Sequence, residues 1–167
     1  MKEWDALYGT DRFDNGNSLD FAWLLNQFLA KGNAVLELGC ASGSNIALFL
    51  NKNCNYYGVD GSLVASNKAK EAFPSLTERI THCDFTQTLG AYGGFNVVCE
   101  RASVAHNDIA AIKRCVKLVG KHLLHGGIFI SSDWFSASHS ELKRGEVVET
   151  RTRRNYPDGQ FLGAGIV

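Results

Sequence analysis

The chain has 167 residues, enough for one domain with a hydrophobic core and too few for two ordinary domains. Its apolar share of 45% and charged share of 20% are typical of a globular protein and exclude a disordered one. Seventeen basic residues balance seventeen acidic ones, which argues against a nucleic-acid partner bound through its phosphate backbone.

Cysteine usage and hydropathy indicate the compartment. Five cysteines are scattered without any C-x-x-C pair. Secreted scaffolds pair their cysteines and zinc sites space them closely, so both are disfavoured. The N-terminus has no apolar stretch of signal-peptide length, and no segment approaches 18 apolar residues. The sequence therefore predicts a reduced, soluble, cytoplasmic protein without a membrane partner.

The first half of the chain alternates helical and strand patterns. A helix is predicted to begin at Asn17 or Ser18 and to stop at Gly32, with Leu19 and Trp23 in its apolar stripe. The patterns that follow predict a buried strand over 34–38, a helix around 46–50, a strand over 56–59 and a helix over 62–73, which Pro74 ends.

The second half continues this alternation. A weak strand is predicted over 79–82, and a clearer one over 95–99 after a glycine turn. The most regular helix repeats apolar residues at three and four positions from Ile109 to Leu123, with Asn107 as its predicted cap. Gly126 and Gly127 are predicted to stop it before a fifth strand over 128–131.

Strands that alternate with amphipathic helices imply right-handed crossovers and a sheet covered on both faces. The predicted fold is therefore an α/β three-layer sandwich with a mainly parallel central sheet. In such sheets ligands bind outside the carboxyl ends of the strands, near the point where the strand order reverses.

The turn after the first strand reads VLELGCASGSN. Its small residues let the backbone turn tightly and come close to a ligand, and a packing role alone is the alternative. At the glycine positions of the dinucleotide loop G-x-G-x-x-G, this chain has Gly39, Ala41 and Ser44. A cradle for a pyrophosphate is therefore disfavoured.

Asp60 ends the second predicted strand, about 20 positions after Gly39. Nucleoside-binding folds place an acid here to accept hydrogen bonds from the two ribose hydroxyls. The alternative is a cap for the helix that begins near Ser62. The spacing favours a ribose contact.

Four landmarks occur in order: LELGCASGSN, YYGVDGS, the pair Asp84–Phe85, and FNVVCERASVAH. From about residue 34 to 134 the chain resembles class I S-adenosylmethionine-dependent methyltransferases, which have a Rossmann-like fold. One departure is Ala41, where many members carry a third glycine. The resemblance implies S-adenosyl-L-methionine as the cofactor.

The resemblance also assigns roles to residues. It places Asp60 at the ribose, Gly61 and Ser62 beside the adenine, Asp84 at the adenine amino group and Phe85 near the base. Asp84 as a turn cap and Phe85 as a core residue are the alternatives. The methionine part of the cofactor would be surrounded by Glu37, Gly39, Cys40, Ala41, Ser42 and Gly43. The floor of the site near the sulfonium would be formed by Glu100, Arg101 and Ala102.

Within a single domain of 1–167, the resemblance suggests three parts. Residues 1–16 would cover the cofactor, 17–134 would form the cofactor-binding core, and 135–167 would be a substrate arm or the start of an incomplete C-terminal part. Arg12 would pair with the methionine carboxylate. The alternative for the N-terminal aromatic residues, which include Trp4, is packing on the outside of the sheet.

Candidates for contact with the acceptor are Tyr8, Arg12, His106, Asp133 and Trp134, and the loop after the fourth strand adds Ser103. His106 is a candidate base, with an equally good alternative as an anchor for the following helix. No catalytic residue is assigned, because displacement at a methyl group requires position more than covalent help. No acidic cluster suggests a metal site.

The acceptor is assigned by elimination. The chain has no N-P-P-Y or D-P-P-Y stretch, which disfavours methylation of the amino groups of adenine or glutamine by enzymes with that motif. It has no P-C dipeptide, which disfavours cytosine C5 methylation. A small-molecule acceptor remains. Two other functions stay open: an NAD-dependent oxidoreductase and a non-catalytic cofactor-binding subunit.

The last segment, from residue 146 on, contains Arg151, Arg153 and Arg154. A solvated basic strand is favoured there over an arm that receives an anionic substrate. Family members usually add two strands after the fifth, and the chain ends before a clear second one. An incomplete sheet is therefore expected, as in a fragment or a reduced variant.

Overall fold

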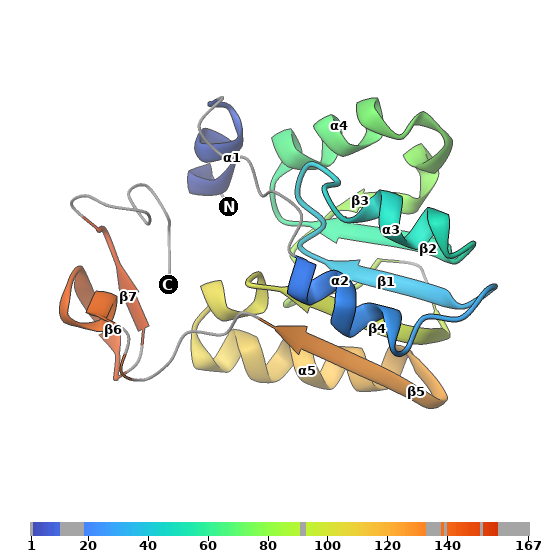
Figure 1. Cartoon of the computed structure of the whole chain (residues 1–167). Coiled ribbons are helices and arrows are strands. Elements are labelled where there is room, and N and C mark those ends of the chain that lie inside the picture. Colours follow the sequence, from blue (N-terminus) through green and yellow to red (C-terminus); the bar gives the residue numbers. More distant parts are fainter. Residues whose placement is uncertain are drawn as a thin grey trace.

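Five parallel strands form the centre of the molecule (Figure 1). The structure is a computed structural model that describes residues 2–10, 19–90, 93–132, 138, 140–150 and 152–156. The strand order is β3-β2-β1-β4-β5. The bounds are β1 Ala34–Leu38, β2 Asn55–Asp60, β3 Ile80–His82, β4 Phe95–Arg101 and β5 Leu123–Ser132. All five predicted strands are thus confirmed, and the order reverses between β1 and β4.

Helices cover both faces of this sheet. They are α1 Lys2–Tyr8, α2 Leu19–Asn26, α3 Ile46–Asn51, α4 Leu63–Ala72 and α5 Ile109–His122, with 3-10 turns η1 Pro74–Arg79, η2 Val104–His106 and η3 Ser140–Lys143. One core contains buried residues of α2, α3 and α4, and the other contains Cys115 and Val119 of α5. Neighbouring residues of β1 alternate between the two cores: Val35 belongs to the first and Leu36 to the second. The three-layer sandwich is confirmed.

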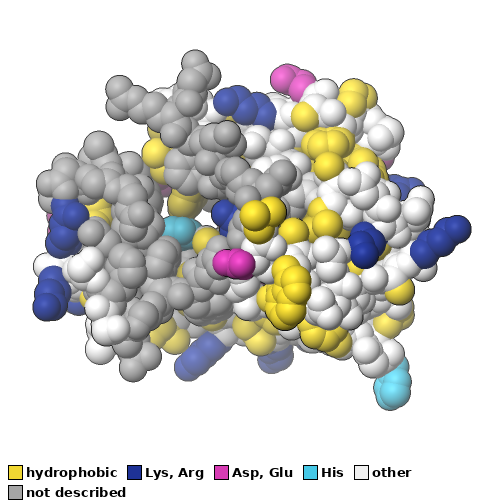
Figure 2. All heavy atoms as spheres, in the orientation of Figure 1, with side chains coloured by type: hydrophobic (Ala, Val, Ile, Leu, Met, Phe, Trp, Pro, Cys, Tyr) yellow, Lys and Arg dark blue, Asp and Glu magenta, His cyan; other side chains and the backbone are white. Residues whose placement is uncertain are grey.

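The helix before β1 differs from its prediction. It ends at Asn26 rather than at Gly32, and its predicted caps lie outside the described residues. Phe21 and Leu25 form its buried side, whereas Leu19 and Trp23 are 84% and 66% exposed. Figure 2 shows hydrophobic side chains gathered on the viewed face around α2. Both pairs have helical spacing, so the pattern alone did not decide which pair faces the core.

The cap and the end of α5 also differ from the predictions. Asp108 caps the helix, because its Oδ1 accepts the Ala111 N–H at 2.7 Å, while the Asn107 amide donates to carbonyls of the preceding turn. The helix ends at His122 because Leu123 already pairs with Phe95 of β4. Gly126 and its neighbour Gly127 therefore lie inside β5, between its first and second paired segments.

The tail forms a separate antiparallel hairpin of β6 Glu146–Glu149 and β7 Thr152–Arg154. The Glu149 carboxylate accepts the N–H of Ile109 at 3.3 Å, which ties the hairpin to the start of α5. The guanidinium of Arg153 donates to the carbonyls of Leu142, Glu149 and Thr152, and Arg154 pairs with Glu146 on the surface. Arg153 and Arg154 thus have partners in the C-terminal part of the chain itself. Arg151 lies outside the described residues.

All five cysteines lie within the described residues and are free thiols. In the part of the chain that the structure describes, no helix has both the length and the apolar character needed to cross a bilayer.

Candidate functional site

The loop after β1 has an unusual backbone. Gly39, Ala41 and Gly43 all have positive φ, at 68°, 51° and 93°. The N–H groups of Gly39 and Cys40 donate to the Val59 carbonyl at 2.8 and 3.1 Å, which holds the loop against the end of β2. A Cβ at Gly43 would fit tightly, because it would lie 3.0 to 3.1 Å from the side chains of Ile46 and Phe73. The predicted tight turn is therefore present.

Asp60 stands at the end of β2 with its carboxylate fixed from two sides. Oδ2 accepts the Ala41 N–H at 2.8 Å, and Oδ1 accepts the Ser62 N–H at 2.7 Å. Burial raises the pKa of Asp60, and the two N–H groups oppose that increase. The cap of α4 is Ser62, whose Oγ accepts the Ala65 N–H at 3.1 Å, so the alternative role of Asp60 as that cap is wrong.

A carboxylate oxygen has about two acceptor positions. The two backbone donors therefore fix the Asp60 carboxylate in place and leave capacity for two further hydrogen bonds. Neighbouring hydroxyls of one sugar have the spacing to use both oxygens.

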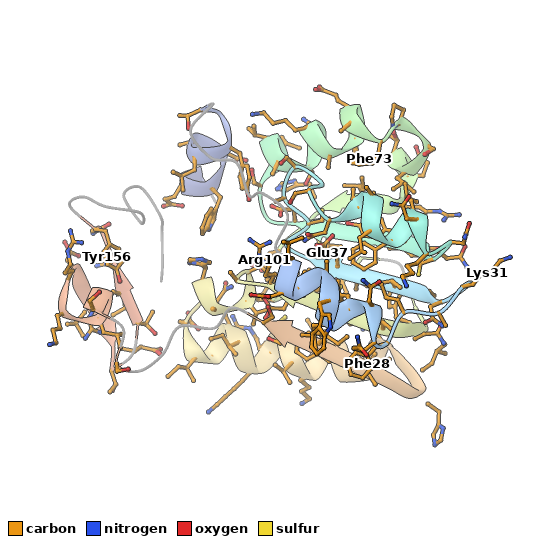
Figure 3. All side chains as sticks on the ribbon, viewed as in Figure 1. Phe28, Lys31, Glu37, Phe73, Arg101 and Tyr156 are labelled. Atoms are coloured by element: carbon orange, nitrogen blue, oxygen red, sulfur yellow. The ribbon has the colours of Figure 1, made fainter. Side chains whose placement is uncertain are left out.

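Glu37 is the penultimate residue of β1 and is buried. Oε1 accepts from the Asn45 amide at 2.8 Å, and Oε2 accepts from the Tyr56 hydroxyl at 2.7 Å. Desolvation raises the pKa of Glu37 to about 6, against the opposing effect of those two donors and of the Arg101 charge. Figure 3 shows Glu37 and Arg101 close together in this view, at the ends of β1 and β4. The charge of Asp60 also raises the pKa of Glu37, so two acids act on this part of the site.

Glu100 has structural partners that the resemblance does not predict. It is fully buried, and its Oε2 accepts from the N–H and Oγ of Ser103 and from the N–H of Val104, at 3.0 to 3.1 Å. Its Oε1 accepts from the Ser131 hydroxyl. The carboxylate therefore joins the loop after β4 to β5. Its predicted place near the sulfonium remains a prediction.

The loop after β3 contains Asp84 and Phe85. Oδ1 of Asp84 accepts from the N–H and the hydroxyl of Thr86 at 2.9 and 2.7 Å, which is the turn-capping alternative. Phe85 packs into the core on the α5 side, which is its structural alternative. Contacts of either residue with an adenine stay predictions.

The N-terminal helix α1 lies at the carboxyl ends of the strands rather than on the outside of the sheet. Tyr8 is buried against Ala41 and Ala65, and the Trp4 ring meets the His106 ring edge-on at 4.9 Å. Figure 1 shows α1 on the side of the sheet to which the strand arrows point. Arg12, Asp133 and Trp134 lie outside the described residues.

The structure thus brings together most of the predicted residues, from the loops after β1, β2 and β4. Gly61 and Ser62 follow Asp60, and Ser42 is half-buried in the glycine loop. The Ala102 N–H donates to the Ser132 carbonyl at 3.0 Å, beside Arg101. Sequence reasoning missed three partners: Asn45 and Tyr56, which hold Glu37, and Asp5, which binds Ser62. The only sequence feature that points to Asp5 is its place directly after Trp4, and this is a weak indication of its contact with Ser62.

A doubly wound parallel sheet, with a glycine loop after β1 and an acid at the end of β2, defines a Rossmann-like nucleotide-binding fold. A family model described as a methyltransferase domain matches residues 36–129, which is more than half of the chain. The chain therefore belongs to the methyltransferase-domain family. Comparison with curated protein sequences gives no significant match.

Solved structures of methyltransferases have the same fold. An S-adenosylmethionine-dependent methyltransferase from Clostridium acetobutylicum is 22% identical over 87% of this chain and 55% of its own, with a TM-score of 0.61. One from Geobacter sulfurreducens, in complex with S-adenosyl-L-homocysteine, is 20% identical over 78% and 54%, with a TM-score of 0.57. A TehB-like enzyme from Corynebacterium glutamicum is 18% identical over 77% and 68%, with a TM-score of 0.59. The chain spans about half the length of the first two.

Proposed function

We propose that this domain binds S-adenosyl-L-methionine across the carboxyl ends of β2, β1 and β4 and transfers its methyl group to a small-molecule acceptor. The observation that carries the proposal is the Asp60 carboxylate, fixed by the N–H groups of Ala41 and Ser62 with acceptor capacity left for a ribose diol. Family membership supports it, and so does the S-adenosyl-L-homocysteine bound in a similar structure.

Charge separates this proposal from a dinucleotide-dependent oxidoreductase. Dinucleotide-binding folds share an acid at the position of Asp60, but here Glu37 adds a second buried acid beside the glycine loop. The two acids favour a cationic ligand, such as one with a sulfonium and an ammonium group, and disfavour a pyrophosphate. The chain also lacks the G-x-G-x-x-G spacing of dinucleotide-binding loops, which likewise disfavours an oxidoreductase.

The residues then have defined tasks. The glycine loop, Gly39 to Gly43, would follow the methionine part through its backbone, with Glu37 next to it. Asp60, Gly61 and Ser62 would hold the ribose and border the adenine. Asp84 and Phe85 would complete the adenine side, and Glu100, Arg101 and Ala102 the floor.

When bound, the cofactor supplies an electrophilic methyl group. The contribution of the chain is to orient this group, to exclude water and to place the acceptor, and alignment alone accounts for roughly 7–11 kcal/mol of a barrier in favourable cases. His106, whose ring meets that of Trp4, would contact an acceptor from the β4 side.

Calorimetric titration of the 167-residue chain with S-adenosyl-L-homocysteine and with NAD⁺ tests the cofactor. We expect binding of the first only, and a loss of roughly tenfold to a hundredfold in affinity for Asp60→Ala, as for a lost charged hydrogen bond. Asp60→Asn is the second variant, because Asp60→Ala also leaves two N–H groups without an acceptor. Asp20→Asn, on the exposed side of α2, is the control. Selective binding of NAD⁺ would overturn the proposal.

Product formation tests catalysis separately. The chain, S-adenosyl-L-methionine and a panel of small amines, thiols and hydroxyl compounds are incubated, and release of S-adenosyl-L-homocysteine is measured. Release that depends on one acceptor supports a transferase. Tight cofactor binding without release across the panel would favour a non-catalytic binding subunit.

A further inference from the structure

Helix α1 contacts the loops of the three central strands. Tyr8 packs on Ala41 after β1, Asp5 bonds to Ser62 after β2, and Trp4 meets His106 after β4. In the strand order β3-β2-β1-β4-β5, these loops lie on both sides of the reversal point. One short helix therefore touches both halves of the proposed site.

Polar contacts attach α1 to α4 at two places. The Asp5 carboxylate accepts from the Ser62 hydroxyl at 2.7 Å and from the Val64 N–H at 3.1 Å. These bonds lower the pKa of Asp5, so it is ionised at neutral pH. At the other end of α1, the Lys68 ammonium donates to the Tyr8 carbonyl at 2.7 Å. The two attachments fix both the position and the rotation of α1.

Ser62 links this attachment to the ribose carboxylate. Its N–H donates to Asp60, whereas its hydroxyl donates to Asp5 and accepts from Ala65. The polar groups of a single residue are thus divided between Asp60 and α1. A shift of Asp5 therefore reaches Asp60 through one residue.

Trp4 and Tyr8 are four residues apart, so they project from the same side of the helix. Asp5 lies between them in the sequence and determines how that side meets the loops. Seating of α1 therefore places Tyr8 against the glycine loop and Trp4 against His106 at the same time.

We propose that Asp5 is a positioning residue: by fastening α1 to Ser62, it couples the packing of Tyr8 on the glycine loop to the orientation of His106 on the acceptor side. This inference rests on the proposed function for the identity of the two half-sites. The contact of Trp4 with His106 and its dependence on Asp5 are independent of any ligand.

The ligand-free test is the NMR signal of the His106 ring protons, assigned with His106→Gln. The Trp4 ring lies 4.9 Å away and shifts these signals through its ring current. We expect Asp5→Ala and Trp4→Leu both to move them toward the values of an isolated histidine, and Asp5→Asn, which retains an acceptor oxygen, to restore much of the original shift. Glu71→Ala, an exposed acid of α4, is the charge-matched control.

The ligand test is the affinity for S-adenosyl-L-homocysteine. We expect a loss of roughly fivefold or more for Asp5→Ala and for Trp4→Leu, and none for Glu71→Ala, as is typical of coupled sites. Unchanged His106 signals, or unchanged affinity, in folded Asp5→Ala would overturn the inference. The proposed function would still stand in that case, provided that the wild-type chain binds S-adenosyl-L-homocysteine. Failure of the wild-type chain to bind would instead overturn the proposed function.

Discussion

Ser103 occupies the space that a side chain at Gly39 would need. A Cβ on Gly39 would overlap the Ser103 Cβ and lie 2.7 Å from its Oγ, and that hydroxyl donates to the Leu38 carbonyl at 2.8 Å. The loops after β1 and β4 thus touch directly at this point. Glycine at position 39 makes this contact possible, and its predicted place beside the cofactor remains a prediction.

We therefore expect Gly39→Ala to destabilise the fold by about 2 kcal/mol or more, through the overlap and through its positive φ. The double variant with Ser103→Gly should lose less than the sum of the single losses, because it removes the overlap. Urea unfolding of the four proteins measures this coupling. Additive losses would show that Ser103 is not the obstacle.

Ala41 has a φ of 51°, a conformation that costs a residue with a Cβ roughly 1–2 kcal/mol. We expect Ala41→Gly to raise the free energy of unfolding by up to about 1 kcal/mol, because it removes this strain. The greater flexibility that glycine gives the unfolded chain reduces this gain. Ala47→Gly, at an exposed position in α3, should lower the free energy of unfolding by about 1 kcal/mol. Thermal or urea unfolding distinguishes the two signs, and a loss for Ala41→Gly would contradict the strain argument.

Glu37 should give the fold a pH dependence. Its pKa is about 6 when folded and 4.5 ordinarily, so between these values the folded chain binds a proton that the unfolded chain releases. Stability from this residue is therefore greatest at low pH and falls, by on the order of 2 kcal/mol, as the pH rises from 4.5 to 6.

Glu37→Gln cannot titrate, so its stability relative to wild type should increase through that pH window. Urea unfolding of wild type and Glu37→Gln at several pH values between 4.5 and 7 measures the difference in stability. Glu71→Gln, which changes an exposed acid in the same way, is the control. A difference that stays constant with pH would show that Glu37 has an ordinary pKa in the folded state.

The sequence predicted β1, β2 and β4 well because each is largely a short apolar run bounded by turn residues, whereas the signal for β3, which reads ITH, was weak. The sequence predicted helix ends less well, since Asn107 and Asp108 are both good caps and only the hydrogen bonds distinguish them. The contacts that organise the site could not be predicted. Asp5 and Ser62 are 57 positions apart, and Ser103 and Leu38 are 65 apart. No local pattern records such pairs.

Glu100 provides the last prediction, because its two oxygens face different donors. Oε2 faces the N–H groups of Ser103 and Val104, which cannot become acceptors, whereas Oε1 faces the Ser131 hydroxyl, which can. Glu100→Gln can therefore keep its oxygen toward the backbone and donate its amide to Ser131. We expect it to cost about 1 kcal/mol or less.

Glu100→Ala leaves those two buried N–H groups without their acceptor and should cost on the order of 3 kcal/mol or more. Adding Ser131→Ala to Glu100→Gln removes the acceptor for the new amide, so the double variant should lose more than Glu100→Gln alone. Urea unfolding of the four variants checks the order. Equal losses for Glu100→Gln and Glu100→Ala would mean that the charge, rather than the acceptor geometry, holds the β4 loop to β5.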